Sequence, residues 1–457
     1  MAGAIVLVVA AGNAGAAGFQ LFEQNASGLG NAYAGQAAAA EDASTIYFNP
    51  AGLTRLRGTQ AVAALNLIKP AVDFRNSASC APFLGVGAGT SGCPLGPNGN
   101  LGHAFGGDGG DAGDLAAVPN VYASWEAVPN RLWIGLGINA PFGLKTEWDA
   151  DWVGRFHAIK SEVKTINVNP TLAWKINDVV SVGAGVSLQR LSAELSNAVS
   201  YRAVALASGN AALIGATPAG AEGVATVEGD DLGWGWNVGA TFDLAPATRL
   251  GVSYRSKVDY TLEGDVRFGS RPAALGAVPQ VADGGVTAEI ELPPMFSIAL
   301  AQQLGARWQL LVDWTWTGWD SIRDLTIVRA SGPLAGQTLT STALRFDNSW
   351  RAGLGLNWQA SPEWKLRAGV AHDNTPVQDA FRTPRLPDAD RTWLALGAQW
   401  AFAPNAALDF GYVHIFARDA TSNLPNQESV TSAPRGSLVG TYEANVDIIS
   451  AQLRWRF

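Results

Sequence analysis

The residue types that most often carry chemistry are few and scattered in this sequence. The four histidines stand at positions 103, 157, 372 and 414. None has the HExxH spacing that places two imidazoles and a carboxylate around a zinc ion, and none has an obvious nucleophile partner. We identify no catalytic constellation, and we predict a protein that is not an enzyme and has neither a metal site nor a cofactor.

The two cysteines, Cys80 and Cys93, enclose twelve residues and lie in no zinc-like pattern. An even pair in an exported chain is typical of a disulfide. We predict that the bond closes a loop and contributes about 3 kcal/mol in the chain-entropy model. The alternatives are free thiols or a metal site.

Two glycine-rich stretches resemble binding loops without completing the pattern. Residues 106–111 (GGDGGD) match the first six positions of a calcium-binding nonapeptide repeat. One copy cannot stack into a β-roll, so a flexible loop is the favoured interpretation. Neither GVGAGT from Gly85 nor GLGNAY from Gly28 completes GxGxxG.

Composition narrows the class of protein. Charged residues make up 15% of the 457 residues, against about 25% in soluble proteins. The 47% hydrophobic content argues against disorder. No window reaches about 18 uninterrupted apolar residues, which argues against transmembrane helices. With a net charge of −8 and no basic patch, nucleic acid is a poor partner. What remains is an all-β chain, either a soluble propeller or sandwich or a membrane barrel.

The N-terminus indicates export. Residues 5–10 (IVLVVA) form a short apolar segment, and Ala14-Gly15-Ala16 has the small-x-small form of a cleavage site. We predict a signal peptide over 1–16, although no Lys or Arg precedes the apolar run. The alternative is a buried strand.

Alternation bounded by turn residues predicts fourteen strands. They span 59–75, 119–128, 131–142, 162–176, 179–197, 233–245, 248–268, 285–304, 307–328, 342–361, 364–376, 391–403, 406–423 and 440–457.

The connections alternate between short and long. Two-residue links follow every even strand, from Pro129-Asn130 to Pro404-Asn405, whereas the links at 76–118, 143–161 and 198–232 are long. This is the layout of an antiparallel outer-membrane barrel with short periplasmic turns and long outer loops. In the last strand, Leu453, Trp455 and Phe457 share one face, and polar residues share the other. We expect the apolar face to meet the lipid and the polar face to line the lumen. The seventeen tryptophans suit interfacial girdles, and no propeller repeat is present.

Residues 17–58 lack this alternation and are predicted to form a hatch, or plug, inside a barrel of residues 59–457. The small-residue stretch 29–40 is compatible with a helix. Asn49-Pro50 suits a helix start, with Asn as N-cap and Pro at the first helical position. A plug of this length would block open passage of solutes.

The sequence is similar to the FadL-type long-chain fatty acid transporters, the OMPP1/FadL/TodX family. The resemblance rests on AGFQLFEQNASGLGNAYAG from Ala17, on NPAGLT from Asn49, and on three further segments: 142–148 (FGLKTEW), 167–170 (NVNP) and 384–393 (PRLPDADRTW). Glu41-Asp42 departs slightly from the two Asp frequent in the family. The resemblance implies a fourteen-stranded barrel, a hatch, and an inward kink in the third strand that opens the wall sideways.

Several residues receive roles on this basis. Asn49, Pro50 and Ala51 match the family's NPA motif, which packs near the kinked strand; the alternative is a plain helix cap. Pro141 and Gly143 suit a break in strand hydrogen bonding, or a simple loop entry. Phe19, Leu21 and Phe22 suit a lipid pocket, or ordinary hatch packing.

Arg190 is the expected partner of a ligand carboxylate, because the family's strand also carries Arg there; the alternative is an ordinary lumen-facing charge. The family's second basic residue aligns near Thr326, which is not basic, and Arg323 falls on the other face. Neutral apolar ligands therefore stay open.

We predict passive uptake of long-chain fatty acids or similar hydrophobic molecules across the bacterial outer membrane. Ligand would pass a hatch-side pocket and leave by a lateral opening. The alternatives are an aromatic hydrocarbon transporter of the same fold, a general porin, a barrel enzyme such as a lipase, or an adhesin. Outer-membrane lipid and lipopolysaccharide are the expected surroundings, and a monomer the expected state.

Overall fold

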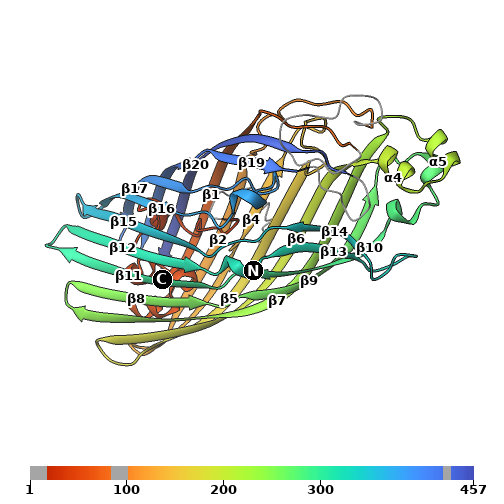
Figure 1. Cartoon of the computed structure of the whole chain (residues 1–457). Coiled ribbons are helices and arrows are strands. Elements are labelled where there is room, and N and C mark those ends of the chain that lie inside the picture. Colours follow the sequence, from red (N-terminus) through yellow and green to blue (C-terminus); the bar gives the residue numbers. More distant parts are fainter. Residues whose placement is uncertain (1–17, 84–100, 426–433) are drawn as a thin grey trace.

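The computed structural model describes residues 18–83, 101–425 and 434–457 and shows a closed antiparallel barrel (Figure 1). Twenty strand segments form fourteen wall strands, because six wall strands are interrupted once. The predicted all-β fold with fourteen strands is confirmed. The predicted signal peptide, 1–16, lies outside the described residues.

The segments are β1 (Gln60–Asn76), β2 (Ala116–Val128), β3 (Leu132–Asn139), β4 (Gly143–Glu147), β5 (Lys160–Lys175), β6 (Val180–Ser200), β7 (Glu222–Ala245), β8 (Thr248–Arg255), β9 (Val258–Phe268), β10 (Gly284–Leu292), β11 (Met295–Leu304), β12 (Trp308–Thr317), β13 (Asp324–Arg329), β14 (Thr338–Ala343), β15 (Ser349–Gln359), β16 (Trp364–Asp373), β17 (Arg391–Ala403), β18 (Ala406–Ala417), β19 (Ala420–Leu424) and β20 (Leu438–Arg456). The interrupted wall strands are β3/β4, β8/β9, β10/β11, β12/β13, β14/β15 and β18/β19.

The barrel closes between its first and last strands. β1 pairs with β20 from Gln60↔Arg456 to Asn76↔Gly440, and with β2 on its other side. Closure removes the free sheet edges that would otherwise expose backbone groups to lipid.

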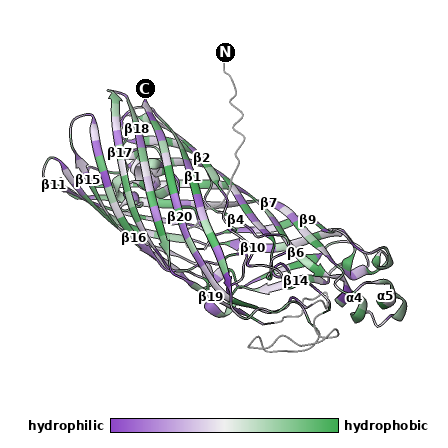
Figure 2. Cartoon of the chain, turned by 90° about the horizontal axis from the view of Figure 1, so that it is seen from above, coloured by the Kyte–Doolittle hydropathy of each residue, from purple (hydrophilic) through white to green (hydrophobic). Residues whose placement is uncertain are grey.

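Successive side chains along a wall strand point alternately toward the lipid and toward the lumen. Figure 2 shows hydrophobic and hydrophilic residues alternating along the strands. On β20, Leu453 is 40% exposed and Gln452 1% exposed, which confirms the predicted lipid and lumen faces at these positions. Exposed tryptophans such as Trp314, Trp364 and Trp455 lie on the outer surface. Among the described residues, no helix is long and apolar enough to cross a membrane.

The helices are short. The α-helices are α1 (Ala26–Leu29), α2 (Gln36–Ala39), α3 (Thr45–Phe48), α4 (Tyr201–Ala207) and α5 (Ala211–Ala216); the 3-10 helices are η1 (Pro50–Arg55), η2 (Ala273–Leu275), η3 (Pro279–Val281), η4 (Trp319–Ser321) and η5 (Asp379–Phe381).

Helices α1, α2, α3 and η1 form the hatch segment inside the barrel, at the end where the C-terminus lies. Helices α4 and α5 lie at the opposite end (Figure 1). The helix expected over 29–40 is wrong: Tyr33 and Gly35 have positive φ angles of 57° and 72° and divide it into α1 and α2. The predicted start at Asn49-Pro50 is confirmed, because Asn49 Oδ1 accepts from Ala51 N at 3.0 Å.

Candidate functional site

The third wall strand breaks and turns inward. β3 ends at Asn139, β4 begins at Gly143, and every residue from 139 to 143 is buried, so the alternation of faces is lost. β3 pairs with β2 and β5, whereas β4 pairs with β5 alone among the described residues. The ladder between β2 and the third strand is therefore interrupted beyond Ile138.

Neighbouring side chains satisfy the backbone at this break. Pro141 contributes no N–H to a ladder. Ala140 N donates to Asn120 Oδ1 at 3.3 Å, and Phe142 N donates to Thr165 Oγ1 at 2.9 Å. The Thr165 hydroxyl donates back to Phe142 O at 2.7 Å. Buried polar groups need such partners. These hydrogen bonds therefore hold the inward turn in a defined conformation, unlike that of a frayed strand end.

The start of the hatch pairs with the broken strand. Gly143 N donates to Phe19 O at 2.9 Å, and Leu21 N donates to Pro141 O at 2.8 Å. Gln20 thus lies opposite Phe142 in a short antiparallel bridge. Residues 19–21 occupy the place where a wall strand would otherwise continue the ladder.

Phe19 joins an aromatic cluster at this point. Its ring centroid lies 4.9 Å from that of Trp319 and 5.9 Å from that of Phe142, and Trp319 lies 6.1 Å from Phe346. The cluster continues into buried lumen residues on several wall strands, among them Leu191, Tyr260, Leu262 and Leu292.

Leu21 and Phe22 belong to a different cluster. Leu21 packs behind the break, where a Cβ on Gly143 would meet its Cδ1 at 3.0 Å. Phe22 lies in the hatch core, 6.5 Å from Tyr33, with the Arg351 guanidinium 5.0 Å above its ring. Of the three residues expected at the pocket, Phe19 alone joins the lumen cluster.

The loop of residues 374–390, between β16 and β17, folds into the barrel above the hatch; we call it the inward loop. Its Asp388 accepts from Gly18 N at 2.9 Å and from Thr375 Oγ1 at 2.6 Å. Trp148, after β4, donates its indole N–H to Pro384 O at 3.0 Å. The inward loop therefore joins the hatch start to the segment that follows the break.

Two small cavities lie in the lumen on the side away from the hatch base. The inner cavity, about 70 Å³, has apolar walls from β5, β6, β7, β9, β10 and β13, including Val163, Leu191, Val227 and Leu262. The outer cavity, about 50 Å³, shares Val227 and adds polar residues. Since Leu191 and Leu262 also belong to the Phe19 cluster, the apolar wall of the inner cavity is continuous with the packing around Phe19 at the broken strand.

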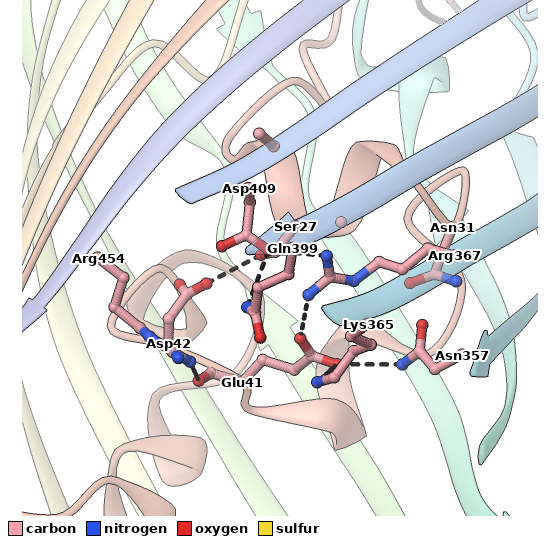
Figure 3. Close-up of polar contacts among 12 residues, drawn as sticks. Ser27, Asn31, Glu41, Asp42, Asn357, Lys365, Arg367, Gln399, Asp409 and Arg454 are labelled. Carbon is pink, nitrogen blue, oxygen red and sulfur yellow. Dashed lines mark hydrogen bonds and ion pairs between the residues drawn. The ribbon is translucent and has the colours of Figure 1, made fainter. Parts of the chain in front are cut away.

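Ion pairs fix the base of the hatch to the wall (Figure 3). Glu41 lies 2.6 Å from Arg367 and 3.2 Å from Lys365, and Arg367 also lies 2.7 Å from Asp409. Gln399 donates to Asp409 at 2.9 Å. Because charged hydrogen bonds are directional and strong, this network sets one position of the hatch base.

The NPA residues contact strands β6 and β7. Asn49 Nδ2 donates to Ala240 O at 3.0 Å on β7, and Pro50 and Ala51 pack against Gly183 of β6. The 3-10 helix that they begin also reaches the kinked strand, since a Cβ on Gly135 of β3 would meet Leu53 Cδ1 at 2.9 Å. Their expected packing near that strand stays a prediction. Gly183 and Gly239 are required on β6 and β7, because a Cβ on Gly183 would lie 2.5 Å from Ala51 N and one on Gly239 2.1 Å from Asn49 Oδ1.

Arg190 does not face the lumen, and that prediction is wrong. Its side chain is 63% exposed and lies 3.0 Å from Asp230 on the outer side of β6 and β7. The neighbours Gln189 and Leu191 are 2% and 1% exposed and face inward. Thr326 likewise bonds the hydroxyl of Ser341 at 2.8 Å on the face opposite Leu325 and Ile327, which line the inner cavity.

Other candidate residues have local roles. Contrary to the sequence expectation, His103 has a serine partner: its Nε2 lies 2.7 Å from Ser200 Oγ, and its Nδ1 lies 3.1 Å from Glu222. Ser200 Oγ also accepts from Ala203 N as the cap of α4. Glu222 also forms an ion pair with Arg155 at 3.1 Å. His103, Ser200, Glu222 and Arg155 therefore attach α4 to the neighbouring loops.

In the 106–111 stretch, Asp111 accepts from Val72 N at 2.8 Å and so attaches this loop to β1. Cys80 is disulfide-bonded. Cys93 lies outside the described residues, so the predicted Cys80–Cys93 pairing stays a prediction.

Comparison with known proteins gives a consistent result. A family model described as outer membrane protein transport protein (OMPP1/FadL/TodX) matches residues 7–457. The 47 kDa outer membrane protein of Pasteurella multocida is 30% identical over 97% of this chain and 96% of its own. The long-chain fatty acid transport protein of Escherichia coli K12 is 27% identical over 90% of this chain and 91% of its own.

Solved structures of related proteins have the same barrel fold. A Pseudomonas aeruginosa FadL homologue superposes with a TM-score of 0.82 at 27% identity, covering 96% of this chain and all of the other. The Pseudomonas putida toluene transporter TodX superposes with a TM-score of 0.63 at 16% identity, covering 91% and 94%, and shows the shared fold alone.

Proposed function

This chain belongs to the OMPP1/FadL/TodX family of outer membrane transport proteins, and from that premise we propose that it takes up long-chain fatty acids or similar hydrophobic molecules. It is an outer membrane transporter of hydrophobic compounds and not an enzyme. The proposal concerns the substrate, the pocket and the exit.

The interrupted ladder between β2 and the third strand carries this proposal. In an intact barrel a ligand in the lumen meets a continuous wall of hydrogen bonds. Here the ladder gap is filled by Phe19–Leu21 of the hatch, held by two backbone hydrogen bonds. Displacement of this short segment would open a sideways path to the membrane without unfolding the barrel. Phe19 and the inner cavity then form the pocket before the exit.

Uptake of radiolabelled oleate by cells that carry the protein tests the proposal. Gly143→Val should reduce uptake, because its side chain would press on Leu21 beside the exit, while oleate binding to the purified protein stays intact. Gly215→Val is the matched control, since a Cβ at Gly215 meets no atom within 4 Å. Normal uptake by a folded Gly143→Val barrel would mean that the ligand leaves by another path.

Aromatic hydrocarbon uptake is the second candidate. The packed rings of Phe19, Phe142, Trp319 and Phe346 beside the broken strand favour it. The same uptake assay with labelled toluene decides between the two. We infer that the closed barrel works as a monomer surrounded by outer-membrane lipid and lipopolysaccharide, since it offers no free sheet edge for pairing.

A further inference from the structure

Two arginines, one in the wall of the outer cavity and one behind that wall, have neutral hydrogen-bond partners. Arg385, in the inward loop, donates to Ser161 Oγ at 3.0 Å, to Asn197 Oδ1 at 3.2 Å and to Lys160 O at 3.2 Å. Arg435, before β20, donates to Thr340 Oγ1 at 2.7 Å. Within the described ranges 18–83, 101–425 and 434–457, neither guanidinium lies in an ion pair.

Four other enclosed arginines differ in this respect, whereas Arg255 and Arg329 also donate to neutral groups and lie in no ion pair among the described residues. Arg155, Arg351, Arg367 and Arg391 each lie within 4 Å of a carboxylate. An enclosed cation without an anion is costly, and Arg435 forms part of a cavity wall, where an anion from outside can reach it.

The outer cavity combines polar and apolar walls. Asn197, Ser200, Thr340 and Arg435 line one part, and Phe156, Val227 and Phe268 are among the residues of the other. Asn197 also accepts from Arg385 Nη2, so Arg385 lies directly behind this wall while Arg435 forms part of it. Val227 connects it with the inner cavity, whose walls are apolar.

The local electrostatics keep this region positive. Burial and, to a smaller extent, the charge of Arg435 lower the pKa of Arg385 to about 9. Burial lowers the pKa of Arg435 too. Burial and these two cations lower the pKa of His157 to about 3, so its imidazole is neutral near pH 7 and adds no competing charge. A bound anion would relieve the repulsion between the two arginines.

We propose that Arg435 and Arg385 bind the carboxylate of an amphipathic ligand at the outer end of the lumen, while its apolar chain extends past Val227 toward Phe19. The inference rests on the proposed function and sharpens it: the preferred substrate is an anion with a long chain, not a neutral hydrocarbon. Because the cavities measure about 50 and 70 Å³, a full acyl chain must push aside the side chains between them.

The test compares oleate with oleyl alcohol, which has the same chain and no charge. Dissociation constants are measured for the full-length protein in lipid nanodiscs, by calorimetry. In Arg435→Gln and Arg385→Gln we expect oleate affinity to fall roughly ten- to a hundredfold, the range for a lost charged hydrogen bond. Affinity for oleyl alcohol should change less than twofold. Circular dichroism melting verifies that each variant is folded.

Arg190→Gln is the matched control, since it removes an arginine from the outer face, and it should leave both ligands unaffected. Equal loss for oleate and oleyl alcohol, or no loss for either, would overturn the proposal. Glu428, the acidic residue of segment 426–433, lies outside the described residues. Glu428→Gln should not change oleate affinity; a tenfold gain would identify Glu428 as the resident partner and also overturn the proposal.

The experiment separates this inference from the proposed function. If the wild type binds and transports oleyl alcohol and oleate equally well, transport of hydrophobic molecules stands and the carboxylate site fails. If the wild type transports neither, the proposed function itself fails.

Discussion

The base and the start of the hatch are attached to the barrel in different ways. At the base, Glu41 lies in ion pairs with Arg367 and Lys365 of the wall, and Arg367 reaches Asp409 as well. At the start, Gly18 N donates to Asp388, residues 19–21 make two backbone hydrogen bonds to the broken third strand, and Phe19 packs on Trp319.

This difference indicates which part moves. A buried ion-pair network is strongly destabilised when one member is displaced. Apolar packing is non-directional and can be re-formed with a ligand chain in place of a side chain. We infer that the base of the hatch stays fixed during transport, whereas its first residues leave the gap between β2 and β4.

Deletion of residues 17–55 should have the largest effect. It removes both attachments and the plug they hold, so a closed barrel should become an ion-conducting pore. Single-channel conductance in planar bilayers measures this directly. Equal conductance before and after the deletion would contradict the plug.

Arg367→Gln tests the base alone. It leaves Glu41 and Asp409 in the interior without their shared partner, and we expect a loss of about 3–5 kcal/mol in unfolding free energy. Urea unfolding in detergent measures it. Arg190→Gln, which breaks an exposed pair, should cost under about 1 kcal/mol. Similar losses in both variants would mean that the base network is not a special attachment.

Phe19→Ala and Phe22→Ala distinguish a ligand-binding residue from a structural residue within the first part of the hatch. Phe19 lies in the lumen cluster and Phe22 in the hatch core. Removing Phe19 should weaken oleate binding by about 1.5–3 kcal/mol, the value of one buried aromatic side chain. Phe22→Ala should reduce stability and leave affinity nearly unchanged. The reverse pattern would move the pocket to the hatch core.

Loss of the disulfide should have the smallest effect on transport. The backbone of Cys80 forms a β-bridge with Ser437 among the outer loops, away from the hatch. Intact-mass measurement after alkylation without reductant should show no label on either cysteine. Reduction should leave oleate uptake within twofold of its starting rate. Two labels before reduction would rule out the Cys80–Cys93 bond.

Sequence patterns predicted the wall well because a membrane imposes alternation on each wall strand. The break at Pro141 and Gly143 was also predictable, since Pro lacks the ladder donor and Gly weakens a strand. Arg190 was assigned to the wrong face because a shift of one residue in a strand reverses the side.

The contacts of the inward loop could not be predicted, because a loop that folds back into a lumen has no periodic signal. Its motif at 384–393 was the available indication, and it contains Arg385 and Asp388. Trp319 and Glu41 gave no signal that distinguishes them from other tryptophans and acids.

A reversible lock on the hatch start tests the central claim most directly. Gln20 and Phe142 face each other as a pair flanked by the two backbone hydrogen bonds. In such a pair the Cα atoms lie about 4.5 Å apart, within the range of a disulfide. The variant Gln20→Cys/Phe142→Cys should fail to take up oleate when oxidised and recover when reduced. The wild type and each single variant should transport under both conditions. Uptake at the wild-type rate by the oxidised double variant, with the cross-link verified by mass spectrometry, would contradict the account.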